Sequence, residues 1–396
     1  MHGLYAHAAP YVGYVYPNET VVPWGELIVI YPYITGLVAG AFIVSSFYHV
    51  FGMHQFRPIA RFALLTALCF LLFAPTPLLF HLGRPERAFN AVITPHWSSA
   101  MAAFGYVAGF YLVILTLEVW FAFRPEMVAR SKTASGALRL LYSALTLGSD
   151  DVSAAALAYD HKWMRALAII GIPSAAGLHG YVGFIFGSLK SREWWSSDLM
   201  PIIFLLSAIV SGVALLAILY VAVWKLRRTE LRDDCLRALA KVMWAFLAVV
   251  LVVEVLEYVE MFYRAREGIG TIMQLINGPL RPGLLIQAVG SASAFAVLTA
   301  LIVSRPRRKT FVVFLTASAS LLIIAVLAMR WNVVIGGQEL SKTMKGLIFF
   351  QPQFLGREGI LSSLLLFAGP FVVLWILARL LPPWEEGGQV REARAQ

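Results

Sequence analysis

The stretch LMPIIFLLSAIVSGVALLAILYVAVW, residues 199–224, carries no charged side chain and is long enough to cross a bilayer as a helix. A helix needs about 20 apolar residues to span the hydrocarbon core. Similar segments recur along the chain, and no alternating strand pattern suggests a barrel. We therefore predict an all-α membrane protein with about nine transmembrane helices. The expected spans are 27–51, 59–82, 98–123, 163–187, 199–224, 238–263, 283–303, 310–330 and 359–381.

The composition supports a membrane protein. Of the 396 residues, 59% are hydrophobic and only 14% are charged, whereas a soluble domain carries about a quarter charged residues. The net charge of +10 comes from basic residues that flank the spans, which is a topological use, so we expect a lipid bilayer and no nucleic acid as partner. Neither Cys69 nor Cys235 lies in a CxxC pattern, so we expect no iron–sulfur cluster and no c-type haem in this chain.

The distribution of Lys and Arg predicts the orientation. Nine spans place the termini on opposite sides. The basic residues concentrate on the side that carries the C-terminal tail and loops 52–61, 124–166, 225–241 and 304–309. By the positive-inside rule, the C-terminus lies in the cytoplasm and the N-terminus outside, in a cell's inner (cytoplasmic) membrane. The first 25 residues contain no Lys or Arg, so a signal peptide is not expected. Within the long loop 124–166, LRLLYSALTLG and VSAAALAYD are expected to be short interfacial helices.

Unusual polar and aromatic residues gather at the outer ends of the spans. Ionisable groups in a bilayer cost several kcal/mol and persist where they are paired or line a cavity. Three glutamates in 238–263 follow each other at i,i+3 steps and so climb one side of a helix. Any one carboxylate could be an ion pair that locks the bundle, and His179 alone could be a satisfied core histidine. The outer-side set is Tyr31, Tyr33, His81, Arg84, Trp97, His179, Trp194, Glu254, Glu257, Glu260 and Arg330.

These residue types favour a quinone over other ligands. A haem between His81 and His179 is conceivable, but no second histidine pair lies at the inner side, so we expect no haem. No HExxH or other paired spacing predicts a metal site. A quinone needs an apolar, aromatic slot and one hydrogen-bonding group at each carbonyl. Its oxidation also needs a proton acceptor, for which a histidine or a membrane carboxylate is suited.

The motifs in these regions resemble those of the polysulfide reductase/nitrite reductase membrane subunits, the NrfD-like family. The resemblance rests on VPWGELIVIYPYITGLVAGAF, on LGRPERAFN followed by TPHWSSAMAAFGY, on GLHGYVGFIFG with WWSSDLMPIIF, on EMFYR and on the Arg330 region. It implies two consecutive four-helix bundles plus a ninth helix. The corresponding division is an extracytoplasmic arm (1–26), a first bundle with the quinone site (27–187), a second bundle (188–333), and an outer loop, last helix and cytoplasmic tail (334–396).

The resemblance also implies a quinone, with menaquinone expected, and no prosthetic group in this chain. An iron–sulfur, ferredoxin-like subunit would dock over loops 83–97, 188–198, 264–282 and 331–358, beside a catalytic subunit such as a molybdopterin enzyme or hydrogenase. In the expected mechanism Tyr31 and His179 hold the quinone carbonyls and His81 assists proton exchange. Tyr33, Trp97 and Trp194 form walls, Arg84 and Arg330 orient the loops or stabilise the half-reduced quinone, and Glu254, Glu257 and Glu260 relay protons.

Two alternatives stay open at this point, and one residue has two interpretations. The chain could be an ion or solute transporter, which a pair of broken helices would favour; Pro75 and Pro173 are weak hints of this. It could also be a passive membrane anchor of a complex. Glu118, near the inner end of the third span, is either part of a proton route to the cytoplasm or the partner of a neighbouring helix.

Overall fold

The computed structural model describes residues 9–96, 98–229, 231–264 and 268–384. In these ranges nine helical segments are long and apolar enough to cross a membrane, and each overlaps a predicted span. The predicted all-α membrane fold is confirmed. The long helices are α1 (Glu26–His49), α2 (Arg57–Phe73), α5 (Ala100–Thr133), α7 (Ala154–Gly187), α8 (Met200–Leu226), α9 (Asp233–Tyr263), α11 (Arg281–Ser304), α12 (Arg308–Val334) and α14 (Ile360–Leu380).

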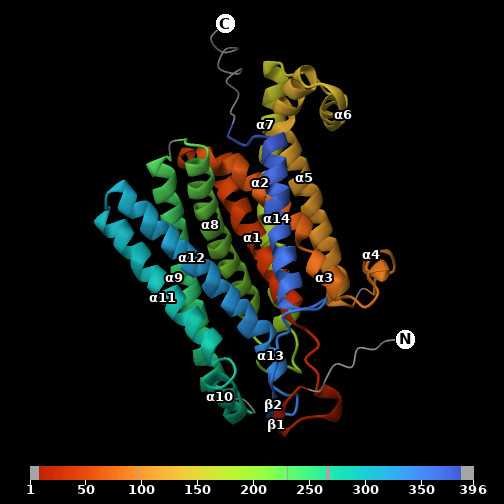
Figure 1. Ribbon diagram of the computed structural model, residues 1–396, viewed down its shortest axis with the longest axis vertical. Coiled ribbons are helices and arrows are strands. Elements are labelled where there is room, and N and C mark those ends of the chain that lie inside the picture. Colours follow the sequence, from red (N-terminus) through yellow and green to blue (C-terminus); the bar gives the residue numbers. More distant parts are fainter. Residues whose placement is uncertain (1–8, 97, 230, 265–267, 385–396) are drawn as a thin grey trace.

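Short elements cap the two ends of the helix assembly (Figure 1). They are the strands β1 (Tyr11–Tyr14) and β2 (Lys345–Ile348) and the helices α3 (Thr76–His81), α4 (Asn90–Ile93), α6 (Gly136–Leu145), α10 (Ile269–Asn277) and α13 (Gly336–Glu339). We call the end that carries β1, β2, α10 and α13 the strand end. The opposite end, with α6 and the turn between α11 and α12, is called the hairpin end.

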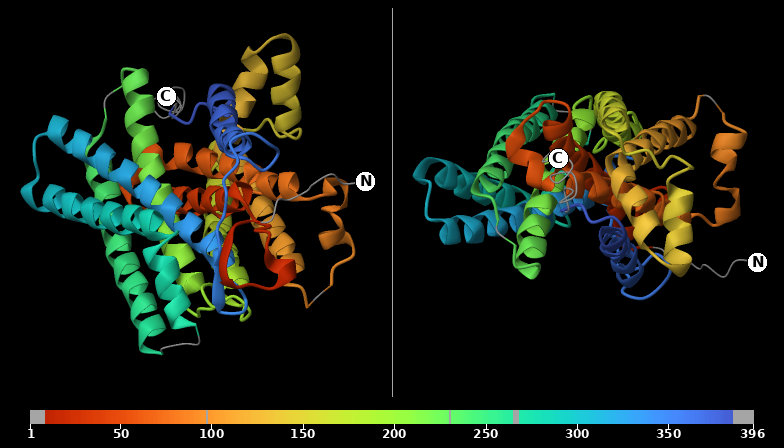
Figure 2. Two further views of the ribbon diagram at one scale, coloured as in Figure 1. Left: turned by 60° about the horizontal axis from the view of Figure 1, so that its bottom comes forward. Right: turned by 90° about the horizontal axis from the view of Figure 1, so that it is seen from above.

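Helix α1 lies at the centre of the molecule. It packs against α2, α7, α8 and α12, and 89% of its most apolar window is buried. Helices α9, α11 and α12 gather on one side of α8, while α5 packs on α7 and α14 on α2 (Figures 1 and 2). The division of these helices into two four-helix bundles stays a prediction.

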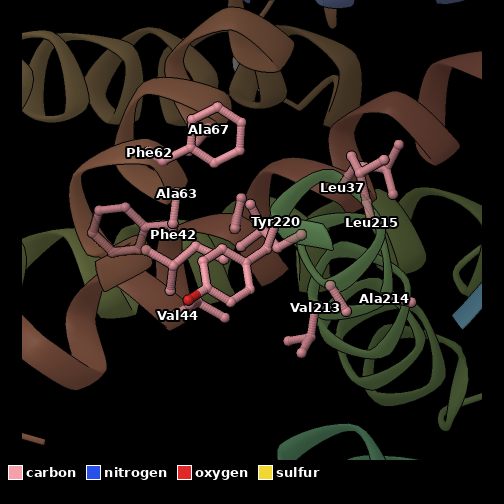
Figure 3. Packing of buried hydrophobic residues seen from close by; sticks show 14 of the residues in the cluster. Leu37, Phe42, Val44, Phe62, Ala63, Ala67, Val213, Ala214, Leu215 and Tyr220 are labelled. Carbon is pink, nitrogen blue, oxygen red and sulfur yellow. The ribbon is translucent and has the colours of Figure 1, made fainter. Parts of the chain in front are cut away.

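Two glycines allow α1 and α8 to cross closely. A Cβ atom added to Gly40 would lie 2.6 Å from the Cα atom of Gly212, and the reverse distance is the same. Membrane helices associate through van der Waals contact, and small residues let their backbones approach. The surrounding core interlocks side chains of α1, α2 and α8 (Figure 3), among them Leu37, Phe42, Val44, Phe62, Ala63, Ala67, Val213, Ala214, Leu215 and Tyr220.

The prediction of a long loop at 124–166 is wrong. Helix α5 continues to Thr133 and α7 already begins at Ala154, so VSAAALAYD forms the first turns of α7 rather than a separate helix. A buried ion pair joins the two extended helices: Nη2 of Arg124 lies 2.6 Å from Oδ2 of Asp160, and Nε donates to both oxygens of the same carboxylate. Two charges that would stop a membrane helix neutralise each other. Of the two segments, only LRLLYSALTLG contributes to a separate short helix as expected, because α6 (Gly136–Leu145) covers its first eight residues.

The strand end is held by contacts between distant parts of the chain. β1 pairs with β2 in antiparallel register, with Tyr11 opposite Ile348. The buried carboxylate of Glu19 accepts hydrogen bonds from Oγ of Ser341 and from the amide of Lys342, and lies 3.3 Å from Nη1 of Arg192. Burial lowers the pKa of Arg192 and the Glu19 carboxylate opposes that shift. The segment before α1 is therefore fixed onto the segment after α12.

Candidate functional site

Arg330 lies inside a helix rather than at its end. The eighth span was predicted to stop at residue 330, but α12 continues to Val334 and Arg330 is only 1% exposed. Its Nη2 atom donates to the carbonyl of Phe204 (3.2 Å) and to Oγ of Ser207 (3.0 Å), and its guanidinium carbon lies 3.9 Å from the centre of the Phe204 ring. These contacts with α8 satisfy part of the guanidinium and let the helix continue past a cation.

The charge of Arg330 acts on groups from three further helices. These are His179 of α7, Tyr33 of α1 and Glu254 of α9. In the predicted division of the chain, His179 and Glu254 belong to separate bundles. A charge within a membrane marks a functional position unless it is fully paired, and Nε of Arg330 has no hydrogen-bond partner in the described part of the chain. Arg330 is thus the electrostatic centre of the candidate site.

His179 and Tyr31 are buried polar groups that lack partners. His179 is 2% exposed and Tyr31 is 4% exposed. Among residues whose placement is described, neither ring nitrogen of His179 and not the hydroxyl of Tyr31 finds a hydrogen bond. Tyr31 belongs to an apolar cluster that includes Val182 of α7, one helical turn beyond His179. Buried polar groups are almost always satisfied, so each of these two groups needs a partner from outside the described residues, either water or a ligand.

The two tyrosines of α1 have different surroundings. The ring of Tyr31 meets the ring of Phe104 on α5 edge to face, with centroids 5.7 Å apart. The hydroxyl of Tyr33 instead donates to the carbonyl of Ile323 on α12 at 2.9 Å, and its ring lies beside Phe367 of α14. Tyr33 therefore fastens α1 to α12 and α14, whereas the Tyr31 hydroxyl is available to a ligand.

His81 and Arg84 lie nearer the surface. Nδ1 of His81, at the end of α3, is 3.0 Å from a carboxylate oxygen of Glu358, just before α14. The charge of Glu358 also acts on Glu26 in the first turn of α1, which is buried and has one oxygen without a partner among the described residues. Arg84 is exposed in the loop after α3. His81, Glu358 and Glu26 thus form a row of neighbouring polar side chains near the start of α1.

The tryptophans at the strand end hold the end of α12. Nε1 of Trp194 donates to the carbonyl of Asn332 at 2.9 Å, and Nε1 of Trp195 donates to the carbonyl of Val333 at 2.5 Å. Trp97, the third predicted wall residue, lies outside the described residues. Trp194 also lines a small cavity in the second half of the chain.

That cavity, of about 60 Å³, brings two of the predicted relay residues together. It can hold a few water molecules but is far below the roughly 300 Å³ of a typical ligand pocket. Glu254 is hydrogen-bonded to Gln287, which in turn accepts from Nδ2 of Asn332 at 2.9 Å. Glu257 accepts from Oγ of Ser197 at 2.6 Å. The polar lining residues are Trp194, Glu254, Glu257, Tyr258, Gln287 and Asn332.

The other two predicted relay residues lie elsewhere. Glu260 pairs with Arg264 at 2.8 Å and is not among the residues that line the cavity. Glu118 on α5 is fully buried, and within the described ranges neither of its oxygens has a hydrogen-bond partner. The hydroxyl of Tyr111, two turns earlier on α5, is likewise unbonded there. The interpretation of Glu118 as the partner of a neighbouring helix therefore gains no support.

Several residues of the site were not singled out from the sequence. Ser207, Gln287 and Asn332 are uncharged, so the presence of ionisable groups does not indicate them. Polar amides within apolar spans nevertheless indicate hydrogen bonds between membrane helices. Glu358 lies in a loop, where a carboxylate attracts no notice. Its pairing with His81 joins residues 277 positions apart, and no local pattern reports such a contact.

Comparisons with known proteins agree with this architecture. The family model described as "Polysulphide reductase, NrfD" matches residues 16–341. A selenate reductase subunit of Mesobacillus selenatarsenatis is 30% identical over 318 residues, which cover 79% of this chain and 73% of that protein. A putative dimethyl sulfoxide reductase membrane subunit of Halobacterium salinarum is 29% identical, with 58% and 50% covered. The Hdr-like menaquinol oxidoreductase integral membrane subunit of Archaeoglobus fulgidus is 25% identical, with 55% and 47% covered. The chain belongs to the NrfD family of polysulphide reductase-type membrane proteins.

Proposed function

We propose that this chain is the quinone-reactive membrane subunit of a respiratory oxidoreductase, and that it binds the quinone head group between Tyr31 and His179. The names of its relatives describe membrane subunits of reductases, which supports the general role. The observation that carries the specific site is the pair of buried side chains from α1 and α7 without hydrogen-bond partners in the described chain, one of them within the field of Arg330.

The chemistry of these side chains fits a quinone. When bound, the quinone supplies two-electron, two-proton redox chemistry, and menaquinone is the expected species. The Tyr31 hydroxyl can donate to one carbonyl, and a ring nitrogen of His179 can donate to or accept from the other. The positive charge of Arg330 favours negative charge developing near His179. Tyr31 and His179 therefore bind and orient, and Arg330 sets the local electrostatics.

Access to the site would run between α5 and α7. Phe104 is half-buried, and its ring contacts Tyr31 on one side and stacks on Tyr181 of α7 on the other, with centroids 6.4 Å apart. In this proposal the Phe104 and Tyr181 rings, which lie beside Tyr31, would move aside to admit the head group. Ring rotation in a lipid-facing wall is a small change, and it gives the quinone tail direct contact with lipid.

Protons would leave by groups on either side of Arg330. His81, Glu358 and Glu26 extend toward the strand end. Glu254 and Glu257 border the small polar cavity, which has room for water. Carboxylates and histidine in these positions can accept and pass on protons. The first group would serve exchange with the outer side, and the second a route into the second half of the chain.

The electron-transfer partner would dock on the strand end. We assign this end to the outer face on the positive-inside rule, with the N-terminus outside and the C-terminus in the cytoplasm. Three tyrosines of the segment that carries β1 are exposed there, and exposed apolar side chains are common at protein contacts: Tyr11, Tyr14 and Tyr16. An iron–sulfur subunit on this surface would carry electrons between the quinone and a catalytic subunit such as a molybdopterin enzyme or hydrogenase.

The substitution His179→Gln tests the proposal in the purified complex. We expect quinol-linked turnover to fall at least tenfold and copurified quinone to be lost, while partner subunits still copurify. His54→Gln is the matched control because His54 is exposed near the hairpin end, and it should leave both readouts unchanged. Full quinol turnover in an assembled His179→Gln complex would contradict the quinone site.

The same preparation discriminates the alternatives. A passive anchor would copurify with partners but without quinone, and a transporter would move solute as a lone protein. A transporter of the broken-helix type needs paired breaks. The second span is interrupted between Phe73 and Thr76, but α7 continues through Pro173. The two prolines therefore do not produce a matched pair of breaks.

A further inference from the structure

A second and larger cavity lies at the hairpin end, away from the proposed quinone site near the strand end. Its volume is about 400 Å³, and it is formed where α9, α11 and α12 meet. The residues around it are Arg237, Ala240 and Lys241 of α9, Leu301 and Ile302 of α11, and Phe311 of α12, with Arg305 just after α11. A cavity of this size can hold a small-molecule head group.

Three cations and no acid line this cavity. Arg237, Lys241 and Arg305 all belong to its wall. The neighbouring acids of α9 are already engaged, since Asp233 pairs with Arg308 at 3.1 Å and Asp234 with Arg232 at 2.8 Å. In the described ranges, which omit Glu230, the structure pairs none of the three lining cations with a carboxylate. The cavity thus presents uncompensated positive charge.

The rest of the wall is apolar and adjoins the bilayer. The guanidinium of Arg237 sits 4.8 Å from the centre of the Phe311 ring, which holds its charged head beside an apolar surface. Leu301 and Phe311 are buried, whereas Val303 and Val313 on the same two helices are exposed and face lipid in a membrane. Ala240 contributes only a methyl group at the centre of the α9 face. The site therefore combines a cationic rim with an aliphatic floor.

The backbone conformation at the end of α11 determines where one of the cations lies. Arg305 ends α11 in a left-handed conformation, with φ 45° and ψ 55°. A non-glycine residue adopts this conformation at a cost of about 1 kcal/mol or more. The turn that results leaves the Arg305 side chain in the cavity wall, opposite the two cations of α9.

We propose that this cavity binds the phosphate of an anionic phospholipid. Arg237, Lys241 and Arg305 would surround the phosphate, and Leu301 and Ile302 would contact the acyl chains. Basic pockets between membrane helices at the bilayer surface are suited to phospholipid head groups. The bound lipid would fasten α9, α11 and α12 to one another at the end opposite the redox partner.

The test uses the full chain in its complex, in nanodiscs of phosphatidylcholine alone or mixed with phosphatidylglycerol. Phosphatidylglycerol retained per complex is measured by native mass spectrometry, on the fraction that elutes as a folded complex. Each basic residue near the surface contributes about fivefold to such binding. We therefore expect about fivefold less retained phosphatidylglycerol in Arg237→Gln, Lys241→Gln or Arg305→Gln, and almost none in the triple variant.

Two further variants separate this site from general charge effects. The triple variant R139Q/K162Q/R165Q removes the same charge from exposed positions of α6 and α7 at the hairpin end and should retain the lipid. Ile302→Trp narrows the cavity at a half-buried position, leaves all three cations in place and should lose the lipid. Equal losses in both triple variants, or full retention in Ile302→Trp, would overturn the proposal.

Free phosphate is distinguished by a separate arm. Phosphatidylglycerol should raise the thermal unfolding midpoint of the complex, and inorganic phosphate added to phosphatidylcholine nanodiscs should not. If inorganic phosphate reproduces the rise and displaces retained phosphatidylglycerol, the cavity is a site for soluble phosphate and the lipid assignment is wrong. If neither phosphate source raises the midpoint and no lipid is retained, the cavity has no phosphate ligand.

Discussion

Tyr31 and Tyr33 provide an internal comparison, because the same substitution should have opposite effects at two positions of one helix. Tyr31→Phe removes a buried hydroxyl that has no partner in the described chain but keeps the ring against Phe104. An unsatisfied buried polar group costs about 1–3 kcal/mol, so without quinone this variant should be about 1 kcal/mol more stable. Tyr33→Phe removes the bond to the carbonyl of Ile323. Its expected cost is about 0.6 kcal/mol, an average for hydrogen bonds between membrane helices.

For quinol oxidation, we expect Tyr31→Phe to be the impaired variant and Tyr33→Phe to be unaffected. If the Tyr31 hydroxyl donates to a quinone carbonyl, its loss removes about 1 kcal/mol of binding and raises KM for quinol about fivefold. Tyr33→Phe should leave KM unchanged because its hydroxyl is used within the protein. The assays are thermal unfolding of the quinone-depleted complex and steady-state quinol oxidation. Shifts of the same sign in stability, or an unchanged KM in Tyr31→Phe, would refute the reasoning.

Three further predictions follow from the packing and the polar groups. In a thermal melting experiment, Gly40→Ala should destabilise the protein by about 1–3 kcal/mol, because the new Cβ meets the α8 backbone. Gly109→Ala on α5 is the control, and it should be neutral or stabilising because the space around Gly109 is open. Glu254→Gln should slow proton-coupled turnover at least tenfold in a stopped-flow pH assay. Glu260→Gln, which lies away from the cavity, should change the rate by less than twofold. Equal rates in the two variants would argue against a proton relay through Glu254. Ser153→Ala should lower stability by about 1 kcal/mol, since its Oγ accepts from the third amide of α7, and an unchanged melting temperature would show that this cap contributes nothing.

The fold could be predicted from the sequence wherever a local property decides it. Span positions follow from apolar length, and the last helix was predicted within one residue at each end. The predicted helix ends were wrong where a charged side chain is bound by a residue far away in the sequence. Arg124 and Asp160 each look like a helix boundary until they are seen to pair. Arg330 looks like an exit from the membrane until Ser207 and the Phe204 carbonyl are seen to receive it.

The site residues chosen from the sequence stay a prediction, and the structure shows only which of them lie near one another. Residue chemistry identified His179, Tyr31, Arg330 and Glu254 as a group, and the charge of Arg330 acts on two of the other three. The sequence offers no means to separate Tyr31 from Tyr33, because both are tyrosines on α1 and they differ only in contacts with helices distant in sequence. The pairing of β1 with β2 likewise joins segments more than 300 residues apart.

The central position of α1 has a consequence for how the protein is made. One of its two main packing partners, α8, begins about 150 residues after α1 ends. At roughly 5–20 residues per second, the ribosome needs on the order of 10–30 s to deliver it. During that interval the surface of α1 that includes Gly40 has no α8 to cover it. Gly40 would then face lipid, or an insertase or chaperone, until α8 arrives, so substitutions there act on membrane insertion as well as on final stability.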